Sequence, residues 1–536
     1  MSLTQLSEQP GIAETLIKQA PYVADPLDIY QRLCTDKANT LLLESAEIDS
    51  KDDLKSLILI DAAIKLVCNG HQVDIFALNT NGESILPLFI KHAPKNVSST
   101  LNTDADQVTM QFPHPDVDLD EDARLKAPAV FDALRLIVEQ IHCLRDHPQN
   151  IFLGGAFAYD LLASFEKLPE VGPSENTCPD FVFYLAQSLL VIDHQQQTTE
   201  MVSTVFSGAH VSSSYFAVSQ QMEQIISDLQ HLATAPELAT PSNYVDKVEI
   251  DKDDTAFKQD VLDLKEHILA GDIFQVVPSR TFSLACPAPY LAYAELKKQN
   301  PSPYMFFLQD DDFCMFGASP ESALKYDKET NQVEVYPIAG TRPRGKNVDG
   351  SINLDLDSRI ELNLREDNKE KAEHIMLVDL ARNDVARVSR PGSRYVKELL
   401  KVDRYSHVMH LVSRVVGQLR DDLDALHAYA ACMNMGTLVG APKVSAATLI
   451  REVEQKRRGS YGGAVGYINS HGDMDTCIVI RSAFVKQGIA YIQAGAGIVH
   501  DSDPQSEADE TRGKAQAVIN AILSSHRPFL SQESAS

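Results

Sequence analysis

The pattern of apolar and polar residues divides the chain into two segments joined by a polar stretch. Residues 233–256 mix Pro, Ala, Ser and acidic residues without an apolar period, which is typical of a linker. We therefore predict an N-terminal domain over residues 1–240 and a C-terminal domain over residues 250–522. The last residues, 523–536, are predicted to be a frayed tail.

In the N-terminal segment, short apolar runs predict strands and one longer run predicts a helix. The runs LLLESAEI (41–48) and DIFALNT (74–80) have strand-like composition, whereas the apolar residues of 128–146 recur with the spacing of a helix packed on one face. The stretch 94–127 is polar and contains several prolines, so we expect a long loop or insertion there.

In the C-terminal segment, predicted helices are interspersed with predicted strands. A helix is predicted from residue 254, with Asp254 as a candidate N-cap and Gly271 as its stop, and another covers 366–385. The short spacing of the last three strand-like runs favours antiparallel pairing, so we expect an α/β or α+β fold with a large sheet system. The strand-like runs are 303–309, 313–319, 332–340, 461–468, 476–485 and 490–499.

Composition and charge exclude several classes of function. Of the 536 residues, 44% are hydrophobic and 23% charged, which is typical of a soluble globular protein. A formal charge of −27 provides no basic surface for nucleic acid or anionic membranes. No signal peptide or membrane span is evident, and the eight cysteines form no CxxC pair, which argues against a disulfide framework or a zinc site. We therefore expect a cytoplasmic protein.

Two pairs of glutamates are candidates for a metal site. Glu370 and Glu373, and likewise Glu507 and Glu510, are three residues apart, so each pair projects from one face if its segment is helical. If these faces meet, four carboxylates converge, which suits Mg²⁺. The competing interpretation is two solvated helix faces, which is the usual role of an isolated ExxE. A cap and a proline in DSDPQ, directly after the glycine-rich AGAGIV, favour the metal interpretation.

Basic residues are expected inside a cleft, because an acidic surface repels acidic ligands at long range. The candidates are Arg342, Arg344 and Arg481. Strand alternation across 476–485 places Arg481 among small apolar residues, where it needs either a structural carboxylate or a substrate carboxylate. In another predicted strand, YSHVMHLVS, alternation places His407 and His410 on opposite faces, so at most one of them points into a cleft.

One phosphate-binding pattern is rejected. Residues 340–347, GTRPRGKN, match GxxxxGK, but Asn347 replaces the required Ser or Thr and Pro343 removes a backbone donor. A nucleotide hydrolase is therefore the weakest hypothesis.

The sequence resembles the chorismate-binding enzymes, and among them the anthranilate synthase component I family, because ten motifs occur in the family's order. The resemblance covers nearly all of residues 250–520, and LLLES extends it to the first domain. The resemblance implies large antiparallel-rich sheets packed as a β-sandwich with helices outside. The motifs are DIFQVVPSR, PSPYMFF, FGASPES, PIAGTRPRG, KAEHIMLVDLARNDVARV, HVMHLVS, MGTLVGAPK, GSYGGAVGY, CIVIRSAFV and IQAGAGIVHDSDPQSEADET.

The resemblance also implies a reaction. In the chorismate-binding relatives that make isochorismate, salicylate or aminodeoxychorismate, the position matching Ala339 is typically Lys, which can act as a nucleophile or activate water. Ala339 can do neither, so ammonia itself is expected to attack C2 of chorismate while the C4 hydroxyl leaves. Elimination of pyruvate then gives anthranilate.

Residue roles are implied by the matching motifs. Glu373 and Glu510 match Mg²⁺ ligands, with Glu370 and Glu507 behind them. Glu321 matches the general acid and His410 the base, with Thr437 in the motif beside it. The residues implied to bind substrate are Gly340, Thr341, Tyr461, Arg481, Gly495, Ala496 and Gly497.

The first domain is implied to be regulatory and to bind tryptophan as a feedback inhibitor. The competing interpretation is an ordinary strand core. The residues implied to contact tryptophan are Glu44, Ser45, Lys55, Pro303, Tyr304 and Met305.

A partner is implied because the chain has no recognisable glutaminase region. The resemblance implies a separate glutamine amidotransferase subunit (component II) that supplies ammonia, in a heterotetramer of two chains of each kind. Two further alternatives stay open: aminodeoxychorismate synthase component I, and a non-catalytic tryptophan-sensing protein of the same fold.

Overall fold

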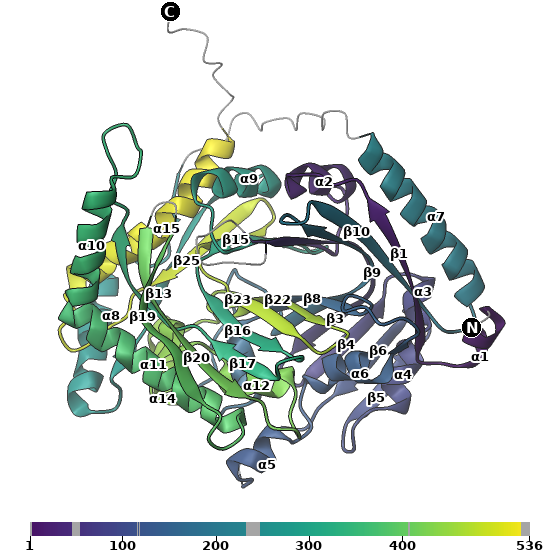
Figure 1. The fold of residues 1–536 in the computed structure, drawn as a ribbon. Helices are drawn as coiled ribbons and strands as arrows, with labels where there is room; N and C mark the ends of the chain where they lie inside the picture. Colours follow the sequence, from purple (N-terminus) through teal and green to yellow (C-terminus); the bar gives the residue numbers. More distant parts are fainter. Residues whose placement is uncertain are drawn as a thin grey trace, which may run out of the picture.

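The computed structural model describes residues 3–45, 54–114, 116, 118–231, 247–405 and 408–526. Most of the predicted linker, the end of the predicted tail and His407 lie outside these residues. Figure 1 shows a mixed α/β molecule in which strands form the centre and helices lie on the outside. In the described part of the chain, no helix has the length and apolar character needed to cross a bilayer.

The N-terminal segment supplies a curved set of strands and short helices. Its longest helix, α7 (Val211–Gln230), lies along one edge of the molecule (Figure 1). The other elements are α1 (Leu3–Glu8), β1 (Ile12–Ala20), α2 (Pro26–Leu33), β2 (Thr40–Glu44), β3 (Lys55–Asn69), β4 (Gln72–Ala77), α3 (Thr80–Glu83), α4 (Leu86–Lys91), β5 (Ser98–Asn102), β6 (Gln107–Gln111), α5 (Glu121–Leu125), α6 (Asp132–Gln140), β7 (His142–Cys143), β8 (Phe152–Phe157), η1 (Tyr159–Ser164), β9 (Phe181–Asp193) and β10 (Thr198–Phe206).

The C-terminal segment supplies more strands and the longest helices. Its elements are β11 (Glu249–Ile250), α8 (Asp254–Ala270), β12 (Gln275–Val276), β13 (Ser279–Ala285), α9 (Pro289–Gln299), β14 (Tyr304–Gln309), β15 (Cys314–Ser319), β16 (Ser322–Asp327), β17 (Gln332–Val335), β18 (Ile338–Pro343), α10 (Leu354–Glu366), α11 (Asn368–Val388), β19 (Tyr395–Arg404), β20 (Val408–Gln418), α12 (Ala425–Cys432), α13 (Gly436–Val439), β21 (Gly440–Ala441), α14 (Lys443–Glu454), β22 (Ala464–Asn469), β23 (Met474–Ile478), β24 (Ser482–Lys486), β25 (Ile489–Gly495) and α15 (Pro504–Ser525).

Strands from the two segments pair with each other, so the sheet system is continuous. Strand β2 pairs with β14, and β8 pairs with β22, both antiparallel. The long strands β3 and β9 run side by side and change partners along their length: the start of β3 pairs with β2 and its end with β4. The mixed fold with a large antiparallel sheet is therefore confirmed.

Apolar side chains form cores on both sides of the strands. One cluster combines residues of β2, β14 and β15 with residues of β8, β22 and β23, including Leu41, Phe306 and Val465. A second cluster joins strand residues to α2, α7, α9 and α15. A β-sandwich, which stays a prediction, would bury side chains of both layers in this way.

Three predictions about elements are wrong in detail. The expected loop at 94–127 contains the hairpin β5–β6 and the helix α5. The predicted helix at 128–146 is shortened to α6 and is followed by β7. The N-cap of α8 is Asp253, whose side chain accepts from Ala256 N, and not Asp254, although Gly271 ends the helix in a left-handed conformation as expected.

The fourth correction concerns Arg481. The run 476–485 is not one strand, because β23 ends at Ile478 and β24 begins at Ser482. Strand β23 pairs with β16 and β22, whereas β24 pairs with β15 and β25, so residues 479–481 cross between different partners. Arg481 has a φ of 50°, a region that few residues other than Gly adopt, so strand alternation does not set its direction.

Candidate active site

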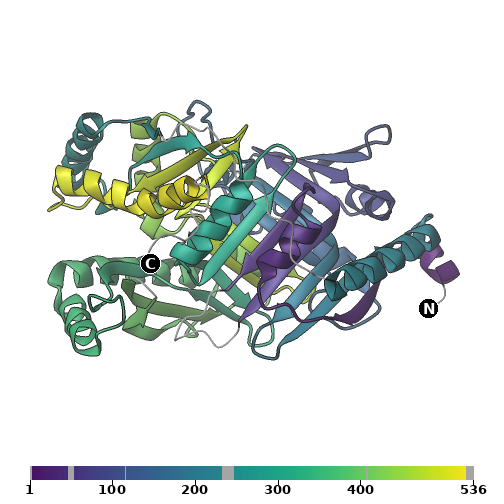
Figure 2. The same ribbon diagram turned by 90° about the horizontal axis from the view of Figure 1, so that it is seen from above.

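A cavity of about 500 Å³ lies between α11, α15 and the ends of several strands, and we call it the carboxylate cavity. Figure 2 shows α15, in yellow, and the green helices α10 and α11 in separate parts of the molecule, and the cavity is lined by residues of α11 and α15. Except for Ala496, it brings together every residue for which the family resemblance implies a catalytic, substrate or metal role. These are Glu321, Gly340, Thr341, Glu370, Glu373, His410, Thr437, Tyr461, Arg481, Gly495, Gly497, Glu507 and Glu510.

A bulge at Gly340 shapes one wall of this cavity. On β18, Ala339 lies opposite Leu411 and Thr341 opposite His410, so the register shifts at the glycine between them. Gly340 has a φ of 74°, and a Cβ there would lie 3.0 Å from Glu370 Oε2. The bulge therefore requires glycine, and it places the Thr341 hydroxyl 3.0 Å from His410 Nδ1.

The candidate acid, Glu321, lies in the turn between β15 and β16. Burial raises the pKa of its carboxyl to about 8, although Thr437 Oγ1 donates to Glu321 Oε1 over 3.0 Å and lowers it in part. At neutral pH the group is protonated, which suits a general acid. The PIAG and SPES motifs meet here, because Ile338 and Pro320 line the same wall.

The candidate base, His410, has the opposite shift. Burial, together with the positive charge of Arg481, lowers its pKa to about 4, so its imidazole is neutral at neutral pH. The ring packs against Tyr405, with 5.1 Å between ring centroids. Environments that push the pKa values of two groups apart are a common feature of acid–base pairs.

Each glutamate pair projects from one helix into the cavity, as the spacing predicts. Helix α15 begins with the N-cap Asp503 and Pro504, which orient Glu507 and Glu510. Burial and the negative charges of Glu370 and Glu510 raise the pKa of Glu373. The positive charge of Lys514, whose Nζ lies 2.6 Å from Glu510 Oε1, lowers the pKa of Glu373 in part.

These residues fit a hydrated divalent cation. Gln275 Nε2 donates to Glu373 Oε1 over 3.0 Å, while Gln275 Oε1 is buried and has no hydrogen-bond partner among the described residues. The described residues contain no group of three or more His, Cys, Asp or Glu side chains that would form a complete metal cage. Mg²⁺ needs only one or two carboxylates, because water and substrate oxygens complete its shell.

Of the three arginines expected in the cleft, only Arg481 lines it, so the expectation is wrong for two of them. Arg342 binds Asp367 and Glu370, and Arg344 binds Asp357, because these carboxylates lie next to them on α10 and α11. In the described part of the chain, no carboxylate forms an ion pair with Arg481. The cavity adds two basic side chains that the sequence argument missed, Lys369 and Lys514.

The glycine-rich end of β25 allows close contacts with the cavity wall. A Cβ at Gly495 would lie 3.0 Å from the Tyr461 hydroxyl, and one at Gly497 would lie 2.7 Å from Gln275 Nε2. Ala496, between them, is fully buried in a core cluster and does not line the cavity. Tyr461 is supported from behind by Arg458, whose guanidinium carbon lies 5.6 Å from the ring centroid.

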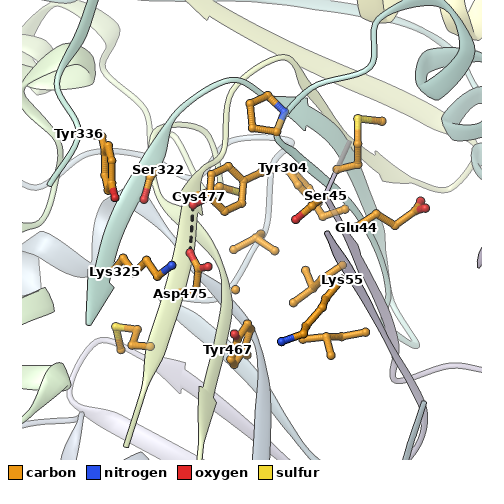
Figure 3. Close-up of a pocket in the computed structure, with 18 of the residues that line it drawn as sticks. Glu44, Ser45, Lys55, Tyr304, Ser322, Lys325, Tyr336, Tyr467, Asp475 and Cys477 are labelled. Carbon is orange, nitrogen blue, oxygen red and sulfur yellow. Dashed lines mark hydrogen bonds between the residues drawn. The ribbon is translucent and has the colours of Figure 1, made fainter. Parts of the chain in front are cut away.

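A second cavity, of about 590 Å³, lies among β2, β3, β14, β16, β20, β22 and β23, and we call it the strand cavity (Figure 3). All six residues expected to contact an effector line it: Glu44, Ser45, Lys55, Pro303, Tyr304 and Met305. Asp475, Tyr467 and Lys325 also line it, and no motif or spacing in the sequence indicated these three residues. Tyr304 Oη donates to Asp475 Oδ1 over 3.1 Å.

Glu44 does not direct its carboxylate into this cavity. Tyr293 Oη donates to Glu44 Oε1 over 2.6 Å, and Lys297 Nζ lies 2.5 Å from Glu44 Oε2. Figure 3 shows the side chain turned away from the other labelled residues. Asp475, by contrast, lies among the other labelled residues of the cavity wall.

The two cavities are neighbours. Pro320 and Ile338 line both of them, and Ser322 in the strand cavity directly follows Glu321 in the carboxylate cavity. The turn at residues 320–322 therefore contributes to the walls of both cavities.

Comparison with known proteins gives consistent matches. The family model described as chorismate binding enzyme matches residues 99–520. Anthranilate synthase component 1 of Vibrio cholerae serotype O1 is 57% identical over 515 residues, which cover 96% of this chain and 97% of that protein. The Escherichia coli K12 protein of the same name is 54% identical over 523 residues, covering 97% and 99%.

A solved structure is also similar. Anthranilate synthase component I from Streptococcus pneumoniae superposes with a TM-score of 0.67 at 28% sequence identity. The match covers 88% of this chain and 94% of the other.

Proposed function

Because this chain belongs to the chorismate-binding enzyme family, we propose that it is the large subunit of an anthranilate synthase in tryptophan biosynthesis. It converts chorismate and ammonia into anthranilate, pyruvate and water. The observation that carries this proposal is a single cavity in which a protonated carboxylic acid, Glu321, and a neutral imidazole, His410, line a space with an unpaired guanidinium, Arg481.

Arg481 binds one carboxylate of chorismate, because a guanidinium forms two parallel hydrogen bonds to such a group. The hydroxyl of Tyr461 lies beside the backbone of Gly495 and orients the enolpyruvyl side. The backbone at Gly340 and Gly497 lets the ring approach the wall closely. Lys369 and Lys514 add positive charge for a dianionic substrate that the acidic surface would otherwise repel.

In the first step, the nitrogen of ammonia bonds to C2 while the C4–oxygen bond breaks. Glu321 donates its proton to the departing oxygen, which leaves as water. In the second step, His410 removes the proton from C2, the bond to the enolpyruvyl oxygen breaks, and the ring becomes aromatic. Enolpyruvate takes up a proton and is released as pyruvate. Ala339 leaves space for ammonia and offers no competing nucleophile.

Glu373 and Glu510 would hold Mg²⁺, with Glu370 and Glu507 behind them. When bound, the cation supplies charge neutralisation for the ring carboxylate. The chain's own contribution is to keep these carboxylates on rigid helices, with Glu373 fixed by Gln275.

The ammonia comes from a glutamine amidotransferase partner subunit in the cytosol. Tryptophan binds in the strand cavity and inhibits the reaction. Ser45, Lys55 and Asp475 supply polar groups at the wall, while Pro303, Met305 and Tyr304 supply the apolar contacts that an indole needs.

The test is an assay of the purified chain without its partner. Chorismate, ammonium and Mg²⁺ should give fluorescent anthranilate, the signal should require Mg²⁺, and tryptophan should suppress it. Chorismate that remains intact, or that forms a product other than anthranilate, would remove the proposal.

A further inference from the structure

One tyrosine contacts both cavities. Tyr405 lines the strand cavity, and its ring packs against the imidazole of His410, which lines the carboxylate cavity. The ring planes are inclined by 59°, with 5.1 Å between centroids. The side chain is buried, so its movement must displace one of these neighbours.

The hydroxyl of Tyr405 reaches the other reacting group through the backbone. Tyr405 Oη donates to the carbonyl oxygen of Pro320 over 3.5 Å, and Pro320 directly precedes Glu321. This distance is at the long end of the hydrogen-bond range, so small movements of the ring strengthen or break the contact.

The backbone of Tyr405 is held by shorter hydrogen bonds than its side-chain hydroxyl. Its N–H donates to the carbonyl of Val408 over 2.8 Å, and Arg344 Nη1 donates to its carbonyl over 2.6 Å. Arg344 is itself fixed by Asp357. The side chain is therefore the part that can respond to a ligand in the strand cavity.

We propose that Tyr405 is a positioning residue that holds His410 and the Pro320–Glu321 turn in their working arrangement. A ligand that fills the strand cavity shifts the Tyr405 side chain and so disturbs both proton-transfer groups. This inference rests on the proposed function for the identity of the reaction. Packed interfaces switch between discrete arrangements, so a small displacement at Tyr405 is sufficient.

The test compares three variants with the wild type. Tyr405→Leu removes both the ring contact and the hydroxyl, and Tyr405→Phe removes the hydroxyl alone. Tyr395→Phe is the matched control, because Tyr395 lies on the neighbouring strand β19 and is 52% exposed. For each protein, ammonia-dependent kcat, KM for chorismate, tryptophan inhibition and calorimetric tryptophan affinity are measured.

We expect Tyr405→Leu to lower kcat by about ten- to a hundredfold, because misplacing a proton-transfer group has effects of this size. KM for chorismate should change little, and Tyr405→Phe should restore most of kcat. Tryptophan should bind Tyr405→Leu nearly as tightly as the wild type but should inhibit its remaining turnover much less. General structural damage would not produce a variant that still binds tryptophan but is no longer inhibited by it.

Two outcomes of the kinetic and binding measurements on Tyr405→Leu would overturn the inference. One is Tyr405→Leu behaving like the Tyr395→Phe control in kcat and inhibition. The other is loss of tryptophan affinity and of inhibition by the same factor, which would make Tyr405 only a lining residue. If Tyr405→Leu fails to fold, the ratio of half-inhibitory concentration to Kd in Tyr405→Phe decides: a raised ratio supports the inference and an unchanged one overturns it.

A readout without turnover separates this inference from the proposed function. Tryptophan should change amide hydrogen exchange along β20 in the wild type, and Tyr405→Leu should abolish that change. If the wild type makes no anthranilate, the proposed function fails while this comparison still decides the inference. Exchange at β20 that responds equally in both proteins, or wild-type protein that does not bind tryptophan, would overturn it.

Discussion

At the residue scale, the two proposed proton-transfer groups have pKa values shifted in opposite directions by burial. Burial favours the neutral form of each, so Glu321 keeps its proton up to about pH 8 and His410 stays unprotonated down to about pH 4. Between about pH 4 and pH 8, Glu321 is therefore the protonated group that can donate a proton, and His410 is the unprotonated group that can accept one. The proposed order of events, protonation of the leaving hydroxyl and then removal of the C2 proton, needs this assignment.

The first prediction is a pH profile. At a constant concentration of uncharged ammonia, kcat/KM should fall above about pH 8, as Glu321 loses its proton, and below about pH 4, as His410 gains one. Thr437→Val removes the donor that stabilises the Glu321 carboxylate, so the pKa rises and the alkaline limb should move to higher pH. Thr448→Val, in which an exposed helical hydroxyl is lost, is the control. An alkaline limb that stays in place or moves down would contradict this role.

The second prediction separates the two chemical steps. His410→Ala should lower anthranilate formation by about two to four powers of ten, because the base is lost. Chorismate should still be consumed, and a product that contains the ammonia nitrogen and retains the enolpyruvyl group should accumulate, as mass spectrometry can detect. His500→Ala, at an exposed position, should resemble the wild type. Equal losses of chorismate consumption and anthranilate would argue that His410 acts before the elimination.

Single residues were only partly predictable from the sequence. The resemblance located Glu321 and His410, but their opposite pKa shifts depend on burial that no local pattern reveals. Arg481 was selected by strand alternation, which is wrong because the chain turns at that residue; its position in the cavity results from the crossing between strands. No local pattern identified Gln275 as a residue of the site, because its hydrogen-bond partner Glu373 is distant in the sequence.

At the element scale, the carboxylate cavity depends on a bulge and on two helices. The bulge at Gly340 pairs Thr341 with His410, and α11 and α15 each present two glutamates. Local patterns predicted the start of α15 and the stop of α8, but they placed the N-cap of α8 one residue late and extended α6 beyond its end at Gln140. The hairpin β5–β6 was not predicted, because its strands are short and polar, and β6 joins the sheet by pairing with β4.

The third prediction concerns this bulge. Gly340→Ala should destabilise the protein by about 1 kcal/mol or more through its positive φ, and crowding against Glu370 and Leu364 should also lower kcat. Gly350→Ala is a matched control, because Gly350 has a φ of 86° with nothing within 4 Å of an added Cβ. It should lower the thermal midpoint alone. If both variants lose stability and keep full kcat, the register at Thr341 and His410 is not important for turnover.

At the scale of the whole molecule, the strand cavity lies where the two segments of the chain meet. Residues of β2 and β3 form part of its wall, and residues of β14, β16, β20, β22 and β23 form most of the remainder. A ligand bound there contacts both segments at once, and the adjacent turn at Pro320 connects it to the carboxylate cavity. The sequence predicted the participating residues through the resemblance, but their meeting results from pairings such as β2 with β14.

The fourth prediction is a stability measurement. Tryptophan at about a hundred times its Kd should add about 2.7 kcal/mol to the free energy of unfolding, because it binds only the folded state. Since the cavity is shared, the transition should shift as one unit in calorimetry. Alanine, which has the same charged groups without the indole, should have no effect. A shift confined to one of two separate transitions would place the ligand within one segment.

The most direct test of the central claim is product analysis by mass spectrometry, with chorismate, Mg²⁺ and ¹⁵N-labelled ammonium as substrates for the purified chain. The account predicts one ¹⁵N-anthranilate and one pyruvate for each chorismate consumed. Labelled product that keeps its enolpyruvyl group without releasing pyruvate, or an unlabelled hydroxylated product, would show that the carboxylate cavity carries out a different reaction on the chorismate ring.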